Sequence, residues 1–399
     1  MATHVVTPTG APALARLQQR ALIVAVIGLL AGGLGAMANP DQFFRSWLIG
    51  FLFCLGLTMG SLGLLMLQHM SGGQWGLIGR RIFEAASRNL PLVVLLFVPL
   101  VFGLPSLFMW ARPEAVAGDA ILQAKAPYLN VPFFLGRAVL YFAVWLFCSW
   151  LLNKWSAAQD RGEVAVQPED TRRFRVVSAP GLIAYIILMT FASVDWMMSL
   201  DPHWFSTIYG FILVAGQGLA AFAFVIAILA LLANTEPFST YLNQRHFHDL
   251  GKLLLAFVML WAYFSFSQFL IIWSGNLPEE ITFFVERLSG GWQYVSIVIL
   301  LGHFALPFTL LLSRDLKRQN GLLAGVAIFI LVMRYVDLVW LVEPTFTHEG
   351  GFPIHWMDVA IPAGLVGLWL FMFARNLRSR ALLPFNDPFF KEAFAHDAH

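Results

Sequence analysis

One stretch decides how the chain has to be interpreted: F-I-L-V-M-R-Y-V-D-L-V-W-L-V-E-P, residues 329–344. It is apolar enough to lie in a lipid bilayer, but it carries Arg334 and Asp337 near its middle. Because these residues are three apart, their side chains share one face of a helix and can pair. An ionisable group inside a membrane span costs ~2.5–3.5 kcal/mol on insertion scales, so it usually has a partner or a function.

The same pattern occurs a second time, upstream. Asp337 is followed six residues later by Glu343 and a proline, and Asp195 is followed six residues later by Asp201 and a proline. A second similarity is found between S-W-L-I-G-F-L (46–52) and S-T-I-Y-G-F-I (206–212). These similarities predict an internal duplication of four spans, with both copies running in the same direction.

Composition places the chain among multi-pass helical membrane proteins. Of its 399 residues, 59% are hydrophobic and only 12% are charged, and the mean hydropathy is +0.72. Soluble domains of this size do not have such a composition. The net charge of +2 indicates no particular partner; we expect contact with membrane lipid and no nucleic acid. The two cysteines each lie in an apolar run, which offers no framework for iron–sulfur or c-type haem in this chain.

Ten stretches are long and apolar enough to span a bilayer. We predict spans at about 21–38, 43–69, 91–110, 132–153, 180–199, 206–232, 248–274, 291–313, 321–343 and 355–376. The predicted fold is all-α, with two tandem four-helix bundles made of spans two to five and six to nine, flanked by the first and tenth spans. The corresponding segments are 1–42, 43–205, 206–344 and 345–399. Gly56 and Gly60 are interpreted as close helix contacts.

Lysines and arginines collect in the tails and in every second loop, which predicts that both termini face the cytoplasm. The opposite loops hold only four of them, Arg45, Arg112, Lys125 and Arg287. Acidic residues gather on that outer side. Asp195 and Asp337 lie six residues, or ~9 Å, below the outer ends of their helices. The tenth span begins outside with His355 and Asp358, again three apart.

Several kinds of chemistry find little support in the sequence. Haem b requires facing histidines, whereas His69 lies at the inner edge of a span and His355 at an outer edge. No two histidines or cysteines within a span have metal-ligand spacing, and the chain has no nucleotide-binding loop or catalytic nucleophile arrangement. We therefore expect no cofactor, no metal and no catalytic residue in this chain.

A proton pathway fits the buried charges better, because carboxylates, histidines and hydroxyls at successive depths in the membrane can pass a proton on without leaving an unpaired charge. The outer half would contain Asp195, Asp337, His355 and Asp358, and His248, Asp249 and Lys252 would take up protons from inside. The candidate pathway residues are Asp195, Asp337, Arg334, His303, His355, Asp358, His248, Asp249 and Lys252. The alternative is that Arg334–Asp337 and His355–Asp358 are structural pairs that hold helices together.

A quinone head group needs a hydrogen-bonding partner at each carbonyl beside an apolar slot, and polar residues of the outer side could supply both. The candidates for a surface next to a quinone are Arg137, Asp201, His203 and Gln268.

Four motifs together resemble one family. They are S-G-N-L-P-E-E (274–280), G-G-W (290–292), H-F-A-L-P-F (303–308) followed by L-L-S-R-D-L-K-R (311–318), and S-L-D-P-H-W-F-S-T-I-Y-G (199–210). The chain resembles the ActF membrane subunits of bacterial alternative complex III, which are similar to the ActC subunits and to the NrfD-like membrane subunits of polysulfide reductases. The short chain, ten spans and cofactor-free loops favour ActF over ActC.

The resemblance implies a subunit of a quinol:electron-acceptor oxidoreductase in the bacterial cytoplasmic (inner) membrane, oxidising menaquinol or ubiquinol and passing electrons to cytochrome c or a high-potential iron–sulfur protein. Haem c and iron–sulfur clusters would belong to partner subunits. The implied partners are an ActC-like membrane subunit, an iron–sulfur subunit, cytochrome c subunits and a terminal oxidase. By the resemblance, Asp195 and Asp337 belong to a proton route. A secondary transporter with parallel repeats is the other hypothesis.

Overall fold

The computed structural model describes residues 12–162, 171–347, 355–390 and 394. Within this part the chain is helical without strands, and ten helical segments are long and apolar enough to cross a membrane. They are α1 (Pro12–Ala38), α2 (Pro40–Ser71), α3 (Gln74–Ser87) with α4 (Leu90–Phe102), α8 (Val131–Asp160), α9 (Arg172–Trp196), α10 (Tyr209–Leu232), α12 (Gln244–Gly275), α14 (Trp292–Val298) with η4 (Ile299–Ala305) and α15 (Leu306–Leu312), α17 (Asn320–Val342) and α18 (Met357–Arg378). The predicted all-α, multi-pass membrane fold is confirmed.

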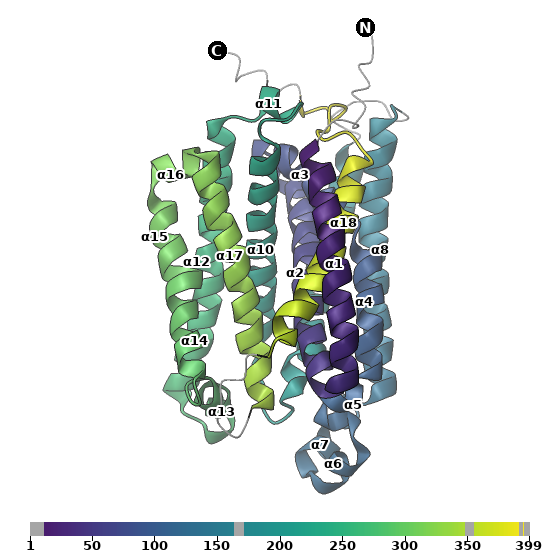
Figure 1. The fold of residues 1–399 in the computed structure, drawn as a ribbon, viewed down its shortest axis with the longest axis vertical. Helices are drawn as coiled ribbons and strands as arrows, with labels where there is room; N and C mark the ends of the chain where they lie inside the picture. The colour runs from purple at the N-terminus through teal and green to yellow at the C-terminus, as the bar shows by residue number, and fades with distance from the viewer. Residues whose placement is uncertain (1–11, 163–170, 348–354, 391–393, 395–399) are drawn as a thin grey trace.

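Short helices connect the spans at the two ends of the molecule (Figure 1). One end, called here the α11 end, has the start of α1, the end of α18 and helices α11 (Phe238–Tyr241) and α16 (Arg314–Arg318). The other, the α13 end, has α5 (Leu104–Leu107), η1 (Met109–Ala111), α6 (Pro113–Gly118), α7 (Ala120–Lys125), η3 (Met198–Leu200), α13 (Pro278–Arg287) and η5 (Glu343–Phe346). The sequence predicted a loop where α13 forms; α12 does end there as expected, with Asn276 in the left-handed conformation at φ 47°.

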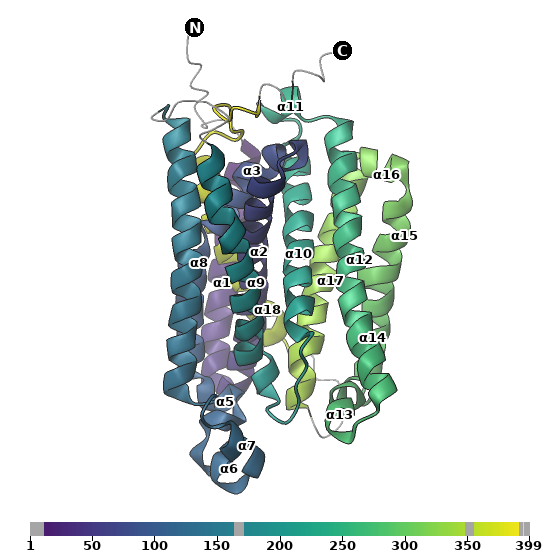
Figure 2. The ribbon, with the colours of Figure 1, turned by 180° about the vertical axis from the view of Figure 1, so that it is seen from behind.

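The helix contacts can be divided into two groups of four helices. The first contains α2, α4, α8 and α9, and the second contains α10, α12, the α14–α15 span and α17. Figure 2 shows α8 and α9 at one side and α12 and α15 at the other, with α2 and α10 between them. The flanking helices α1 and α18 pack against each other and against α2, so the first and last spans are neighbours in space.

The central helices α2 and α10 approach closely because of a glycine. A Cβ atom at Gly60 would lie 2.1 Å from the main-chain oxygen of Gln217, a distance that no side chain could accept. A Cβ atom at Gly56 would lie 3.6 Å from the Gln217 side chain, which is an ordinary contact. Gly60 is therefore the residue that lets the two bundles meet.

The third span begins earlier than predicted. The sequence placed Arg80 and Arg81 in a loop before residue 91, but α3 starts at Gln74 and both arginines are buried. Glu84 accepts hydrogen bonds from Arg80 (2.9 Å) and Arg81 (2.7 Å). Arg80 also reaches Asp387, at 2.5 Å, in the segment after α18. These pairs neutralise the arginines, so the helix extends through a region that looked too charged.

Replacement of Gly60 tests the contact between the bundles. Gly60→Ala should lower the melting temperature of the full chain in detergent, because overpacking costs ~1–3 kcal/mol, more than the ~0.5–1 kcal/mol that alanine gains over glycine in a helix. Gly136→Ala is the matched control, because a Cβ atom there meets no described atom within 4 Å. Its melting temperature should equal or exceed that of the wild type; equal losses in both variants would contradict the assignment.

Candidate functional site

The predicted pair on α17 forms. Arg334 donates to Oδ2 of Asp337, and the two residues are 3% and 2% exposed. The guanidinium group of Arg334 packs over Gly216 of α10, where a Cβ atom would lie 2.5 Å from its central carbon. The absence of a side chain at Gly216 therefore leaves room for the ion pair at the α10–α17 interface.

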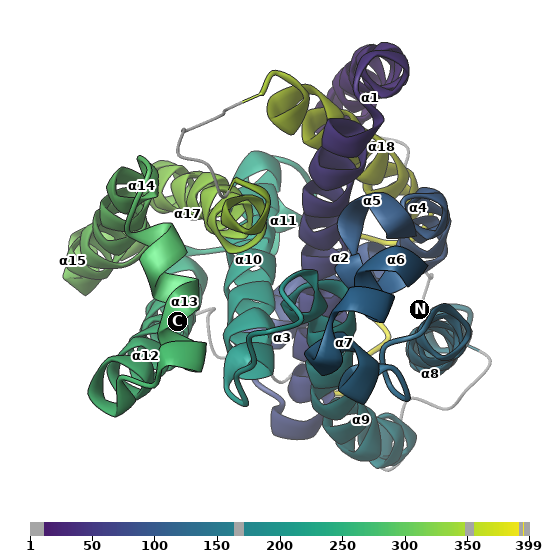
Figure 3. The same ribbon diagram turned by 90° about the horizontal axis from the view of Figure 1, so that it is seen from below.

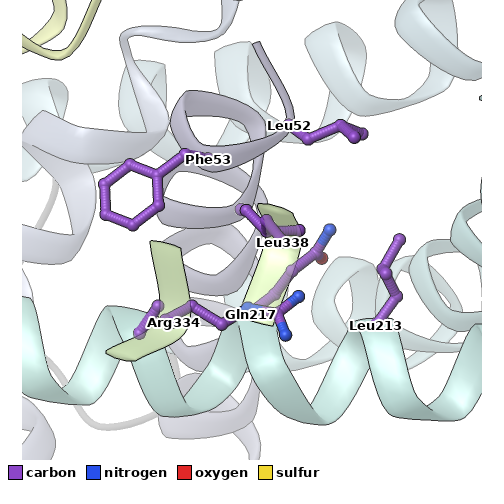
Figure 4. Close-up of a pocket in the computed structure, with 8 residues that line it drawn as sticks. Leu52, Phe53, Leu213, Gln217, Arg334 and Leu338 are labelled. Atoms are coloured by element: carbon purple, nitrogen blue, oxygen red, sulfur yellow. The ribbon is translucent and has the colours of Figure 1, made fainter. Parts of the chain in front are cut away.

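A small cavity of about 10 Å³ lies beside Arg334, where α2, α10 and α17 meet (Figure 4). Gln217 of α10 also lines it, and the side-chain oxygen of Gln217 accepts a hydrogen bond of 2.7 Å from Tyr185 of α9. A space of this size is about enough for one water molecule. Polar groups of both bundles thus approach each other near this point, since Tyr185 belongs to the first bundle and Gln217 and Arg334 belong to the second.

His303 is fully buried in the eighth span. It lies in η4, a π-helical segment of a kind that often marks a functional position. Its ring meets Trp261 of α12 edge to face, with 4.3 Å between the ring centroids. Within the described residues neither ring nitrogen has a hydrogen-bond partner. Arg334 is close enough to interact with it electrostatically, so the structure brings His303 and the α17 pair into one group.

In the first bundle, the buried Asp195 is bound by side chains of a neighbouring helix, α8. Asp195 is fully buried and accepts two hydrogen bonds from Arg137, at 2.7 and 2.9 Å, and one from Tyr141, at 2.7 Å. Arg137 also stacks over the ring of Tyr128, at 3.8 Å. Burial, followed by the charge of Asp195, raises the pKa of Tyr128 to about 12. The carboxylate of Asp195 is therefore fixed by a two-point ion pair and a phenol.

Asp358 forms a third, separate group at the start of α18. It accepts hydrogen bonds from Ser46 (2.6 Å) and Gln42 (2.7 Å) of α2, and from the main-chain nitrogen of His355 (2.9 Å). The His355 side chain does not take part in this contact; its Nδ1 accepts from the nitrogen of Met357, at 3.3 Å. The expected pair of His355 and Asp358 is thus a main-chain contact in this structure, with α2 supplying the side-chain partners of the acid.

Near this group, Glu343 is a buried acid that was not among the site residues predicted from the sequence. Glu343 is 2% exposed, and within the described residues its Oε1 atom has no hydrogen-bond partner. Asp358 and Arg45 are both near enough to interact with it electrostatically.

The residues expected to take up protons lie at the α11 end. Lys252 and Asp249 form an ion pair of 3.0 Å with side chains 57% and 40% exposed, and His248 lies beside them at the start of α12. Trp261, the neighbour of His303, is nine residues further along the same helix, which corresponds to ~14 Å.

The four candidate quinone-adjacent residues do not meet in one place. Arg137 belongs to the Asp195 group. His203 Nε2 lies 2.6 Å from Oδ2 of Asp119, and this bond is the main reason that the pKa of Asp119 is lowered; Asp201 caps the main-chain nitrogen of His203, at 3.2 Å. Gln268 is in the second bundle, 3% exposed.

Gln268 and Asp337 instead line a large cavity of about 650 Å³ in the second bundle, called here the α13-end cavity. Its walls come from α12, α13, the α14–η4 segment and α17. Trp261, Ser296 and Trp340 also line it. The sequence contains one indication of this cavity, since polar residues such as Ser265 and Gln268 occur in the outer part of the seventh span.

Within residues 12–162, 171–347, 355–390 and 394, no group of three histidine, cysteine, aspartate or glutamate side chains could hold a metal ion. No family model matches the chain, and a comparison with curated proteins found no match.

Removal of one partner of the Arg137–Asp195 pair should destabilise the protein. Arg137→Leu leaves a buried carboxylate without its cation, which costs ~3–5 kcal/mol, and should reduce the yield of folded protein in mild detergent. The double variant Arg137→Leu/Asp195→Leu should recover much of the loss, because no charge is stranded. A double variant as poor as the single one, by yield and thermal unfolding, would contradict a mainly electrostatic role.

Proposed function

We propose that the chain is a proton-conducting membrane subunit, without a redox centre of its own, of a quinol:electron-acceptor oxidoreductase of the alternative complex III type. The observation that carries the proton-conducting part is the buried Arg334–Asp337 pair, in which Arg334 interacts with His303 and Asp337 lines the α13-end cavity. The membership in an oxidoreductase rests on the four sequence motifs.

Asp337 is the better candidate for proton exchange than Asp195. Arg334 donates to one oxygen of Asp337, and Asp337 also lines the α13-end cavity. Asp195 is held by Arg137 and Tyr141 through both of its oxygens. The two oxygens of Asp195 are thus occupied by donors, whereas Asp337 borders a cavity through which a proton can reach it. We therefore assign Asp195 as the fixed counter-charge of Arg137.

His303 extends this route toward the α11 end. A histidine can release a proton from one ring nitrogen while it accepts one at the other, and both nitrogens of His303 are available among the described residues. His248, Asp249 and Lys252 would collect protons at the α11 end. By the distribution of lysines and arginines this end faces the cytoplasm of a bacterium, and the α13 end faces outward.

In this proposal the electron carriers belong to other subunits. An ActC-like membrane subunit, an iron–sulfur subunit and haem c subunits would oxidise menaquinol or ubiquinol, with a terminal oxidase as a further neighbour. The transporter hypothesis would favour helices that unwind at mid-membrane. Here α10 is a continuous α-helix from Tyr209 to Leu232, and the eighth span continues through its π-helical segment, which favours the oxidoreductase subunit.

Purification separates the two hypotheses. In mild detergent the tagged chain should co-elute with subunits that contain haem c and iron–sulfur clusters, detected by optical spectra and mass spectrometry. A chain that elutes alone and catalyses solute uptake in liposomes would instead support the transporter.

Asp337→Asn tests the proton route. The substitution keeps the side-chain volume but removes the titratable group, so proton release per quinol oxidised should fall by more than the recovery of assembled complex. Asp195→Asn is the comparison variant, because it makes the same change in a buried ion pair, with Arg137, and its assembled fraction should keep the wild-type proton release per quinol.

The measurement is proton release together with quinol-driven reduction of the acceptor, in proteoliposomes of the intact complex. Wild-type turnover and proton release in Asp337→Asn would refute the assignment of Asp337.

A further inference from the structure

The first bundle has a large cavity of its own at the α11 end, called here the α11-end cavity. Its volume is about 520 Å³, and its walls come from the end of α2, the start of α3, the start of α9 and the segment after α18. Small-molecule sites usually have volumes of roughly 300–1,000 Å³. Figure 3, viewed along the spans, shows α9 at the edge of the molecule beside α8. Because α9 exposes Val176 (61%) and Ile183 (62%), this wall of the cavity borders lipid.

The turn between α2 and α3 forms one wall of the cavity. Gly72 and Gly73 line it and have φ values of 68° and 98°, which glycine adopts most readily. Gly73 is the N-cap residue of the 14-residue helix α3, and no side chain at this position caps the helix. The first N–H groups of a helix have no partners within the helix and form a positive end that binds phosphate. This wall therefore favours a phosphate group.

Arg175 of α9 supplies a positive charge at the cavity. Its exposed side chain donates to Oγ1 of Thr171 at 3.3 Å, and among the residues described no acid forms an ion pair with it. The other lining arginine, Arg80, is neutralised by Asp387 at 2.5 Å and by Glu84 at 2.9 Å. Arg175 can therefore pair with an anion from outside the chain.

A buried acceptor in the wall favours a ligand that also has a donor. Gln68 of α2 is 5% exposed and lines the cavity, and within the described residues its side-chain oxygen has no hydrogen-bond partner. Gly76 of α3 leaves room for this side chain, because a Cβ atom there would lie 1.8 Å from Cγ of Gln68. An unpaired buried acceptor costs ~1–3 kcal/mol, and a hydroxyl group that donates to Gln68 would remove this cost.

The cavity also has apolar lining residues at its surface. Met70 and Phe389 are 44% and 38% exposed, and the ring of Phe174 forms part of the wall. A lipid covers such exposed apolar side chains with its acyl chains, whereas a soluble phosphate ester leaves them in water. The ligand that fits these walls therefore combines a phosphate, a hydroxyl group and hydrocarbon chains.

We propose that the α11-end cavity binds the head group of phosphatidylglycerol, a phospholipid with a single negative charge and glycerol hydroxyls. Arg175 and the start of α3 bind the phosphate. The side-chain oxygen of Gln68 accepts a hydrogen bond from a hydroxyl, and Met70 and Phe389 contact the acyl chains. The site lies in the first bundle, so its occupancy is independent of the proposed function.

Photolabelling tests the site. The full chain, with the subunits that co-purify, is placed in phosphatidylcholine nanodiscs that contain a phosphatidylglycerol probe with a diazirine on its acyl chain, close to the glycerol backbone. We expect label in peptides that cover residues 66–77 or 171–180. Arg175→Gln should raise the half-saturating mole fraction of the probe about tenfold, as expected for one lost hydrogen bond to a charged group.

Arg375→Gln is the matched control for the charge. It removes an exposed arginine at the same end of the molecule, on α18 and outside the cavity, and should leave the half-saturating mole fraction unchanged.

Competition by unlabelled lipids tests the hydroxyl contact. Phosphatidylmethanol is the matched competitor, because it has the charge of phosphatidylglycerol without a hydroxyl in its head group. In the wild type, phosphatidylglycerol should compete about fivefold better, as expected for one neutral hydrogen bond. In Gln68→Leu the two lipids should compete equally.

Three results would overturn the proposal: label confined to other peptides, equal effects of Arg175→Gln and Arg375→Gln, or equal competition by the two lipids in the wild type. Displacement of the probe by soluble glycerophosphate as readily as by phosphatidylglycerol would do so too, since the cavity would then bind a phosphate ester from water.

Discussion

The structure depends on the requirement that a charge inside a bilayer must be paired. Removing an ion from water is expensive, and attraction between partners repays this cost only where the geometry is good and the remaining hydrogen-bonding positions are filled. The two bundles meet this requirement in different ways. In the first bundle, Arg137 comes from a neighbouring helix and donates to Asp195 through two nitrogens. In the second bundle, Arg334 comes from the same helix as Asp337.

The two similar sequence units therefore differ in where the cation comes from. The position three residues before Asp195 is Ala192, whereas the position three residues before Asp337 is Arg334. In the first bundle the cation is therefore supplied across the α8–α9 interface, and the ion pair holds two helices together. In the second bundle the guanidinium group of Arg334 extends from α17 toward α10 and lies over Gly216. Its partner Asp337 also borders a cavity.

Much of the fold was predictable because it depends on local sequence. Hydropathy located the ten spans, and the three-residue spacing identified the Arg334–Asp337 pair. The partner of Asp195 was not predictable in this way, because Arg137 is 58 residues away on another helix. Likewise, Arg80 and Arg81 looked like loop residues, since Glu84, Asp160 and Asp387 neutralise them only in the folded state. The edge-to-face contact of His303 with Trp261 also joins two different helices, so no local pattern predicts it.

The interiors of the two bundles complete the contrast. In the first, the rings of Phe97, Phe142 and Trp145 surround Trp196, with centroid distances of 5.2–6.1 Å, so the space next to Asp195 is filled with aromatic side chains. In the second, a cavity remains beside Asp337. A filled core holds an ion pair still, because close-packed side chains leave no room for movement or water. A cavity lined by a carboxylate allows a proton or a ligand to reach it. The same spacing of acid and proline thus occurs in one bundle where the acid is enclosed by aromatic rings and in another where the acid borders a cavity.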